Sequence, residues 1–79
     1  MIRKFEVTAQ GEGRLDIVSR ISMLYLQRHI EVESLSFSPV EGRQSCYKVM
    51  AAADEITIKR LMGQLSHVEG LDEIECKLL

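Results

Sequence analysis

The sequence lacks the features that mark membrane, exported and nucleic-acid-binding proteins. No apolar run approaches the roughly 18–20 residues of a membrane-spanning helix, and the basic start at residues 1–6 is not followed by the apolar stretch of a signal peptide. Its 10 lysines and arginines are scattered among 12 acidic residues, and the formal net charge is −2. Nucleic-acid binding requires a clustered basic face. We therefore expect a cytoplasmic protein that binds neither membranes nor nucleic acids.

Cysteines are few and low-complexity segments are absent. Cys46 and Cys76 lie far apart without a metal-binding spacing, and without an export signal we expect both to be reduced. The composition is that of an ordinary globular protein. Seventy-nine residues make one domain over residues 1–79 with a modest core, so pairing with a second copy is an expected source of further burial.

The sequence also lacks a recognisable catalytic constellation. Catalysis needs a nucleophile, a base and an orienting group, but neither His29 nor His67 has a serine or cysteine at a motif spacing. Glu31 and Glu33 would share one face of a regular strand, and such a pair can serve acid–base chemistry or bind a metal. A solvated strand face explains them more simply. We expect a protein that is not an enzyme, with no metal and no cofactor of its own.

What the sequence does contain is a clear alternation of two hydrophobic periods. Period-two patterns predict four strands, and these cover residues 2–9, 32–38, 44–52 and 71–79. Spacings of three and four predict two helices, the first from Arg14 or Leu15 to His29 and the second through Leu65, with Asp54 as its cap. Asp16 and Arg20 are spaced to pair along the first helix. We expect a glycine-containing loop at 10–13 and a hairpin turn at 40–43.

This order predicts an α+β fold of the ferredoxin-like βαββαβ type. The simplest arrangement is a four-stranded antiparallel sheet with both helices on one face. Right-handed crossovers then place the second strand at an edge, where it is open to pairing with another copy. Met23 and Leu26 fall outside the buried stripe of the first helix, and we expect them to contact a partner.

One segment has a possible ligand-binding role, the glycine-containing connection over residues 10–16. Backbone N–H groups there, together with the start of the first helix, could hold a carboxylate or phosphate. The segment matches neither the dinucleotide-binding nor the P-loop pattern. A tight turn without a ligand is the alternative interpretation.

Several segments also carry a family resemblance. They are Ile17-Val18-Ser19-Arg20-Ile21, Leu24-Tyr25, Val32-Glu33-Ser34-Leu35, Pro39 and Leu61-Met62-Gly63-Gln64-Leu65. Without gaps through Pro39, they resemble the ACT domain of acetolactate (acetohydroxyacid) synthase small subunits. That family typically reads Pro-Gly-Val-Leu-Ser-Arg-Val-x-x-Leu-Phe, then Arg-Arg-Gly-Phe-Asn-Ile-Glu-Ser-Leu, with Ile-x-x-Gln-Leu in the second helix. The resemblance covers nearly the whole chain, and Glu-Ser-Leu is its most specific part.

The resemblance implies a regulatory subunit. It implies an ACT domain that forms a homodimer through its sheet edge or first helix and binds a larger, thiamine-diphosphate-dependent synthase of branched-chain amino-acid biosynthesis. The chain looks like the short type of small subunit, which has a single domain. The alternative is a stand-alone ACT protein that senses an amino acid or related metabolite, and a small enzyme of the same fold is a third possibility.

The resemblance also implies where an amino-acid effector would lie. In that family the effector is held between two chains, and the matching positions here are Gln10, Gly11, Gly13, Arg14, Leu15 and Asp16 of one chain and His29, Ile30 and Glu31 of the other. Leu15-Asp16 replaces the family's Pro-Gly, and His29-Ile30-Glu31 replaces Gly-Phe-Asn. The carboxylates of Asp16 and Glu31 would repel the effector's carboxylate but could meet its ammonium group.

Overall fold

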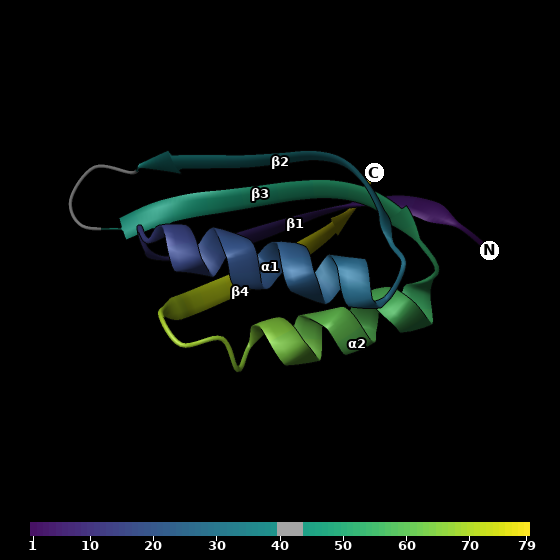
Figure 1. Cartoon of the computed structure of the whole chain (residues 1–79). Helices are drawn as coiled ribbons and strands as arrows, with labels where there is room; N and C mark the ends of the chain where they lie inside the picture. Colours follow the sequence, from purple (N-terminus) through teal and green to yellow (C-terminus); the bar gives the residue numbers. More distant parts are fainter. Residues whose placement is uncertain (40–43) are drawn as a thin grey trace.

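The computed structural model describes residues 1–39 and 44–79 (Figure 1). The elements are β1 (Arg3–Glu12), α1 (Leu15–Gln27), β2 (Glu31–Pro39), β3 (Gln44–Ala53), α2 (Glu55–Leu65) and β4 (Leu71–Leu78). This confirms the predicted order of strands and helices. The predicted hairpin turn at 40–43 lies outside the described residues. Among the described residues, no helix combines the length and apolarity needed to cross a membrane.

Two element boundaries differ from the sequence prediction. The loop predicted at 10–13 is wrong for its first three residues, because β1 continues through Glu12. The first helix ends at Gln27 rather than His29. Both differences fall at the ends of α1, where the expected effector residues lie.

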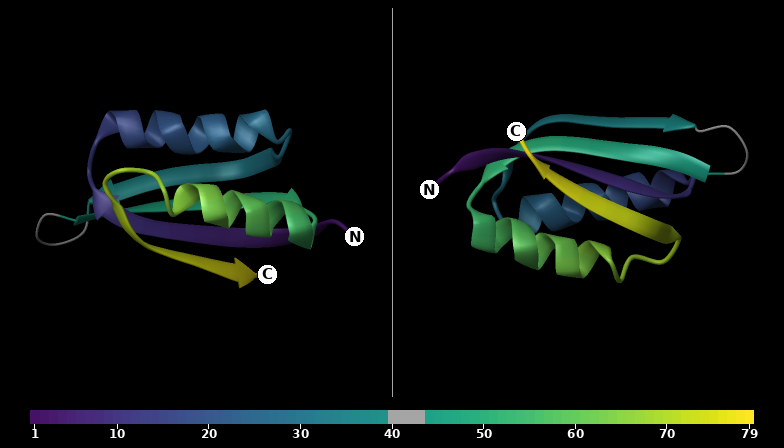
Figure 2. Two further views of the ribbon diagram at one scale, coloured as in Figure 1. Left: turned by 90° about the horizontal axis from the view of Figure 1, so that it is seen from below. Right: turned by 180° about the vertical axis from the view of Figure 1, so that it is seen from behind.

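The four strands form one antiparallel sheet in the order β2-β3-β1-β4. The central pair is continuous from Arg3 opposite Ala53 to Glu12 opposite Gln44. Both helices cover one face of the sheet, and the other face is open (Figure 2). The predicted ferredoxin-like arrangement is thus confirmed, with β2 at an edge.

The core lies between the sheet and the helices. Alternate residues of the central strands face the helices, so every second side chain of β1 and β3 is buried. The buried hydrophobic residues of the strands are Phe5, Val7, Ala9, Tyr47, Val49, Ala51 and Ala53, and those of the helices are Ile17, Ile21, Tyr25, Ile58, Leu61 and Leu65. The apolar stripes predicted for the two helices are therefore the surfaces that pack against the sheet.

The two helices begin differently. Asp54 caps α2 as predicted, because its Oδ1 accepts a hydrogen bond from the Thr57 backbone N–H at 2.7 Å. The same bond lowers the pKa of the Asp54 carboxyl below its usual value, since it stabilises the charged form. The start of α1, at Arg14, has no side-chain cap.

Candidate functional site

Tyr47 fixes the backbone that leads into α1. This β3 residue is 1% exposed, and its hydroxyl donates to the Glu12 carbonyl oxygen at 2.6 Å while accepting from the Arg14 N–H at 3.1 Å. Its ring stacks on Phe37 with 5.0 Å between centroids. Sequence reasoning assigned Tyr47 only to a strand face, so it missed this role. No local pattern reveals a bond between residues so far apart in the chain.

Arg14 gathers the charged groups at the same end of α1. Its Nη1 lies 2.9 Å from Glu12 Oε2 and its Nε lies 3.1 Å from Asp16 Oδ1. The prediction that Asp16 pairs with Arg20 is therefore wrong, because the chain entering the helix brings Arg14 closer. One guanidinium faces two carboxylates here. Because the only cation among these three side chains is already paired with both carboxylates, they offer no free positive charge to an anionic ligand.

The two glycines of this segment serve close packing. A Cβ on Gly11 would overlap the Gly70 carbonyl oxygen and lie 2.8 Å from Leu71 Cα, because β4 begins directly beside it. A Cβ on Gly13 would overlap the Ser45 hydroxyl. Neither glycine has a positive φ. The Arg14 N–H donates to the Glu12 carbonyl oxygen at 3.2 Å and closes a three-residue turn at Gly13, as the tight-turn interpretation predicts. Packing against Gly70, Leu71 and Ser45 explains both glycines without a ligand.

His29 occupies a position that usually needs glycine. Its φ is 54°, and its N–H donates to the Leu26 carbonyl at 3.0 Å while the Ile30 N–H donates to the Tyr25 carbonyl at 3.1 Å. These bonds and the left-handed residue form a Schellman helix end. Ile30 is buried in the core while His29 and Glu31 are exposed. The glycine of the resembled family motif aligns with His29.

Replacing His29 with glycine is expected to raise the free energy of unfolding by about 0.5–1 kcal/mol. The left-handed conformation costs a non-glycine residue about 1–2 kcal/mol, and the larger entropy loss of glycine offsets part of that gain. Urea denaturation measures the change. His67→Gly is the control, since His67 has no positive φ and this substitution should not stabilise the fold.

The structure does not bring the predicted effector residues together within one chain. Residues 10–16 lie at one end of α1 and residues 29–31 at the other (Figure 1). A helix of 13 residues spans about 20 Å, so a site that uses both groups needs two copies. Gln10 is also separated from the other residues of the 10–16 segment. It alternates with buried Ala9 in β1 and therefore belongs to the open face of the sheet.

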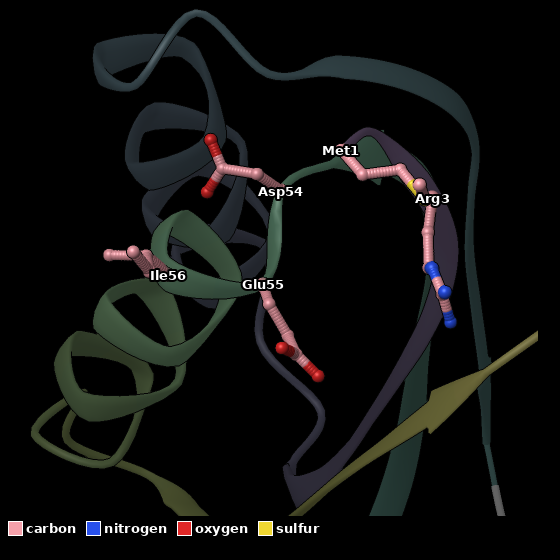
Figure 3. A pocket seen from close by; sticks show the side chains of 5 residues that line it. All are labelled: Met1, Arg3, Asp54, Glu55 and Ile56. Atoms are coloured by element: carbon pink, nitrogen blue, oxygen red, sulfur yellow. The ribbon is translucent and has the colours of Figure 1, made fainter.

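A hollow of about 460 Å³ lies at the start of α2 (Figure 3). Its lining residues are Met1, Arg3, Asp54, Glu55 and Ile56. Asp54 and Ile56 point away from Arg3 (Figure 3), and the Asp54 carboxylate already caps the helix. The charged groups do not converge on a common point, so this hollow presents no organised ligand site.

Two smaller hollows flank α1. The first lies between α1 and α2, has a volume of about 330 Å³ and is lined by Ser19, Arg20, Met23, Leu24, Gln64, His67 and Val68. The second lies between α1 and β2, measures about 320 Å³ and is lined by Ser22, Tyr25, Leu26, Ile30, Val32 and Leu35. Met23 and Leu26 are 52% and 69% exposed, but they line different hollows. The helix therefore presents two separate apolar surfaces.

The strand order and the one-sided helical layer define the ferredoxin-like fold of ACT domains. No protein-family model and no curated protein matches the sequence. Similar solved structures include an uncharacterized protein from Thermotoga maritima (TM-score 0.78, 20% identity, 100% of this chain and 99% of that one). The ACT domain from GTP pyrophosphokinase of Chlorobium tepidum is also similar (TM-score 0.77, 13% identity, 96% of this chain and 86% of that one). An acetolactate synthase small subunit from Thermotoga maritima is similar as well (TM-score 0.79, 16% identity, 94% of this chain and 47% of that one). These similarities establish the fold.

Proposed function

We propose that this protein is a non-catalytic regulatory subunit of an acetolactate (acetohydroxyacid) synthase in branched-chain amino-acid biosynthesis. The observation that carries the proposal is the ungapped match through Val32–Leu35, on a fold shared with an acetolactate synthase small subunit. Of the matched residues, Ile17 and Ile21 are buried in α1 and Leu35 packs against the core from β2. The cofactors of the reaction would belong to the larger subunit.

Titration of the large subunit with this protein tests the proposal. Acetolactate formation by the large subunit should rise severalfold and saturate as the small subunit is added, and the two chains should co-purify. A large subunit from an unrelated thiamine-diphosphate enzyme is the control and should not respond. No stimulation at saturating small subunit would overturn the assignment.

We further propose that the protein forms a homodimer through the β2 edge and the hollow between α1 and β2. An edge strand presents backbone donors and acceptors that can pair with a second copy. The adjoining hollow exposes Leu26 and leaves Val32 39% exposed, so pairing would bury apolar surface from both copies. Such a dimer would also supply the second chain that the expected effector site needs.

Leu26→Glu is expected to convert the dimer to a monomer without unfolding it, because the new carboxylate would enter the apolar interface without a partner. Light scattering after size-exclusion chromatography measures the mass. Met23→Glu is a matched control, since Met23 is an exposed apolar residue of the same helix on the other hollow. If Leu26→Glu stays dimeric, or both variants become monomers, the proposed interface is wrong.

The second candidate is a stand-alone ACT protein that binds an amino acid between residues 10–16 of one copy and 29–31 of the other. The carboxylates at Asp16 and Glu31, both exposed, favour a ligand that presents its ammonium group. A thermal-shift screen of amino acids tests it, because a ligand at 100 times its Kd stabilises the fold by about 2.7 kcal/mol. A flat screen would count against this function and leave the synthase assay unaffected.

A further inference from the structure

The helical layer carries positive charge that the described chain does not neutralise. Four cations belong to the two helices or to the C-cap of α1, and none forms a salt bridge with a described residue. They are Arg20, Arg28, Lys59 and Arg60. Of the acids in the helices, Asp16 is paired with Arg14, and Glu55 stands at the start of α2. Arg60 acts on the Asp54 carboxylate and helps to lower its pKa, whereas Arg20, Arg28 and Lys59 have no acidic partner within salt-bridge distance among the described residues.

The largely apolar hollow between α1 and α2 lies beside two of these cations, Arg20 and Arg28. Met23, Leu24 and Val68 supply its apolar lining, with Arg20 and His67 beside them. Arg28 Nε donates to Gln64 Oε1 at 3.0 Å, which ties the end of α1 to the side of α2. The hollow therefore lies between the two helices, with Arg20 in its lining and Arg28 bonded to its lining residue Gln64. No acidic residue is among the described residues that line it.

Gly63 adds an independent observation. It lies in α2 and is exposed, where glycine costs about 1 kcal/mol relative to alanine. A Cβ at this position would meet nothing within 4 Å, so no described contact requires the glycine. Gly63 does not line the hollow itself, but the next residue along the chain, Gln64, does. The missing side chain leaves room for another backbone to approach α2 closely.

We propose that the surface formed by Arg20, Met23, Gln64 and His67, with Gly63 next to Gln64 on α2, docks an acidic amphipathic helix of a protein partner. Apolar residues of that helix would enter the hollow, its carboxylates would meet the unpaired cations, and its backbone would pass close to Gly63. The inference rests on the proposed function only for the partner's identity, which would then be the larger synthase subunit.

A designed peptide tests this chemistry directly. The probe is a synthetic helix of about 18 residues with leucines along one stripe and glutamates beside it, and the control carries lysine in place of every glutamate. NMR titration of the labelled protein should show shifts centred on Arg20, Met23 and His67 with the acidic peptide alone. Absence of binding, equal binding of both peptides, or shifts centred on the α1–β2 hollow would overturn the proposal.

Two variants separate docking from folding. Arg20→Glu should weaken acidic-peptide binding about tenfold, whereas Lys77→Glu, on the open face of the sheet beside Glu6, should leave it unchanged. Gly63→Leu should raise the melting temperature, because leucine favours the helix, and yet abolish binding. Unchanged peptide affinity in Gly63→Leu would exclude close docking at α2.

The peptide test and the synthase assay can fail separately. The probe does not derive from a synthase, so peptide binding without stimulation of the large subunit would retain this surface and reject the proposed partner. Stimulation without peptide binding would retain the function and reject the surface. Met23→Glu should also weaken the peptide complex while leaving the homodimer intact.

Discussion

Gly11→Ala is expected to lower the free energy of unfolding by about 3 kcal/mol or more. The new methyl group would overlap the Gly70 carbonyl oxygen and crowd Leu71 Cα at 2.8 Å. These neighbours are backbone atoms, so no side-chain rotation can relieve the contact. The Glu12 N–H also donates to the Gly70 carbonyl at 2.8 Å, and that bond would stretch if the two strands separated. Forced repacking of this kind costs about 1–3 kcal/mol and occasionally more.

Thermal unfolding followed by circular dichroism measures this loss. A domain of this size has a stability of about 4–12 kcal/mol, and a loss of about 3 kcal/mol corresponds to a fall of roughly 12–24 °C in Tm. Gly13→Ala is the matched control, because its Cβ would meet the rotatable side chain of Ser45, and it should lose about 1 kcal/mol. Equal losses at both positions would show that the Gly11 contact is not a rigid backbone contact.

Removing a hydroxyl is expected to have opposite effects at the two tyrosines. Tyr25 is 1% exposed and its hydroxyl has no hydrogen-bond partner among the described residues, so Tyr25→Phe should stabilise the fold by about 1–2 kcal/mol. Tyr47→Phe removes the bonds to the Glu12 carbonyl and the Arg14 N–H and should destabilise it by about 1–3 kcal/mol. Urea denaturation of both variants measures the difference. A loss of stability in Tyr25→Phe would show that its hydroxyl is satisfied.

Tyr25 should also make the stability of the fold sensitive to alkaline pH. Burial raises the pKa of Tyr25 above its ordinary value near 10, and a charged Cys76 would raise it further. Above about pH 10 the unfolded chain releases the phenolic proton while the folded chain retains it. The free energy of unfolding therefore falls by up to about 1.4 kcal/mol per pH unit. In a Cys76→Ser background, Tyr25→Phe should reduce this fall above about pH 10.

The sequence predicted the fold well because burial in this protein follows the two hydrophobic periods. Ile17, Ile21 and Ile58 lie at helical spacing and are buried as expected. Asp54 could be predicted as a cap because its bond to Thr57 spans three residues. The edge position of β2 followed from the handedness of the crossovers.

The surroundings of α1 were harder to predict because they depend on contacts between distant residues. The glycines at 11 and 13 suggested a loop, whereas Gly11 is required in a strand by the approach of Gly70. The positive φ of His29 could have been predicted but was missed, since a family glycine at a helix end indicates a left-handed residue. Which residues bind an effector, and whether two chains share the site, remain predictions.

The sheet order has a consequence for how the chain acquires its structure. The central strands, β1 and β3, are separated in sequence by α1 and β2. Their pairing therefore joins residues as far apart as Arg3 and Ala53. During synthesis β1 emerges first, and it cannot pair along its full length until β3, which ends at Ala53, has also been made. Pairings of this kind raise the contact order and slow folding. We expect the nascent chain to acquire its central pairing late, with β1 exposed to other binding partners until then.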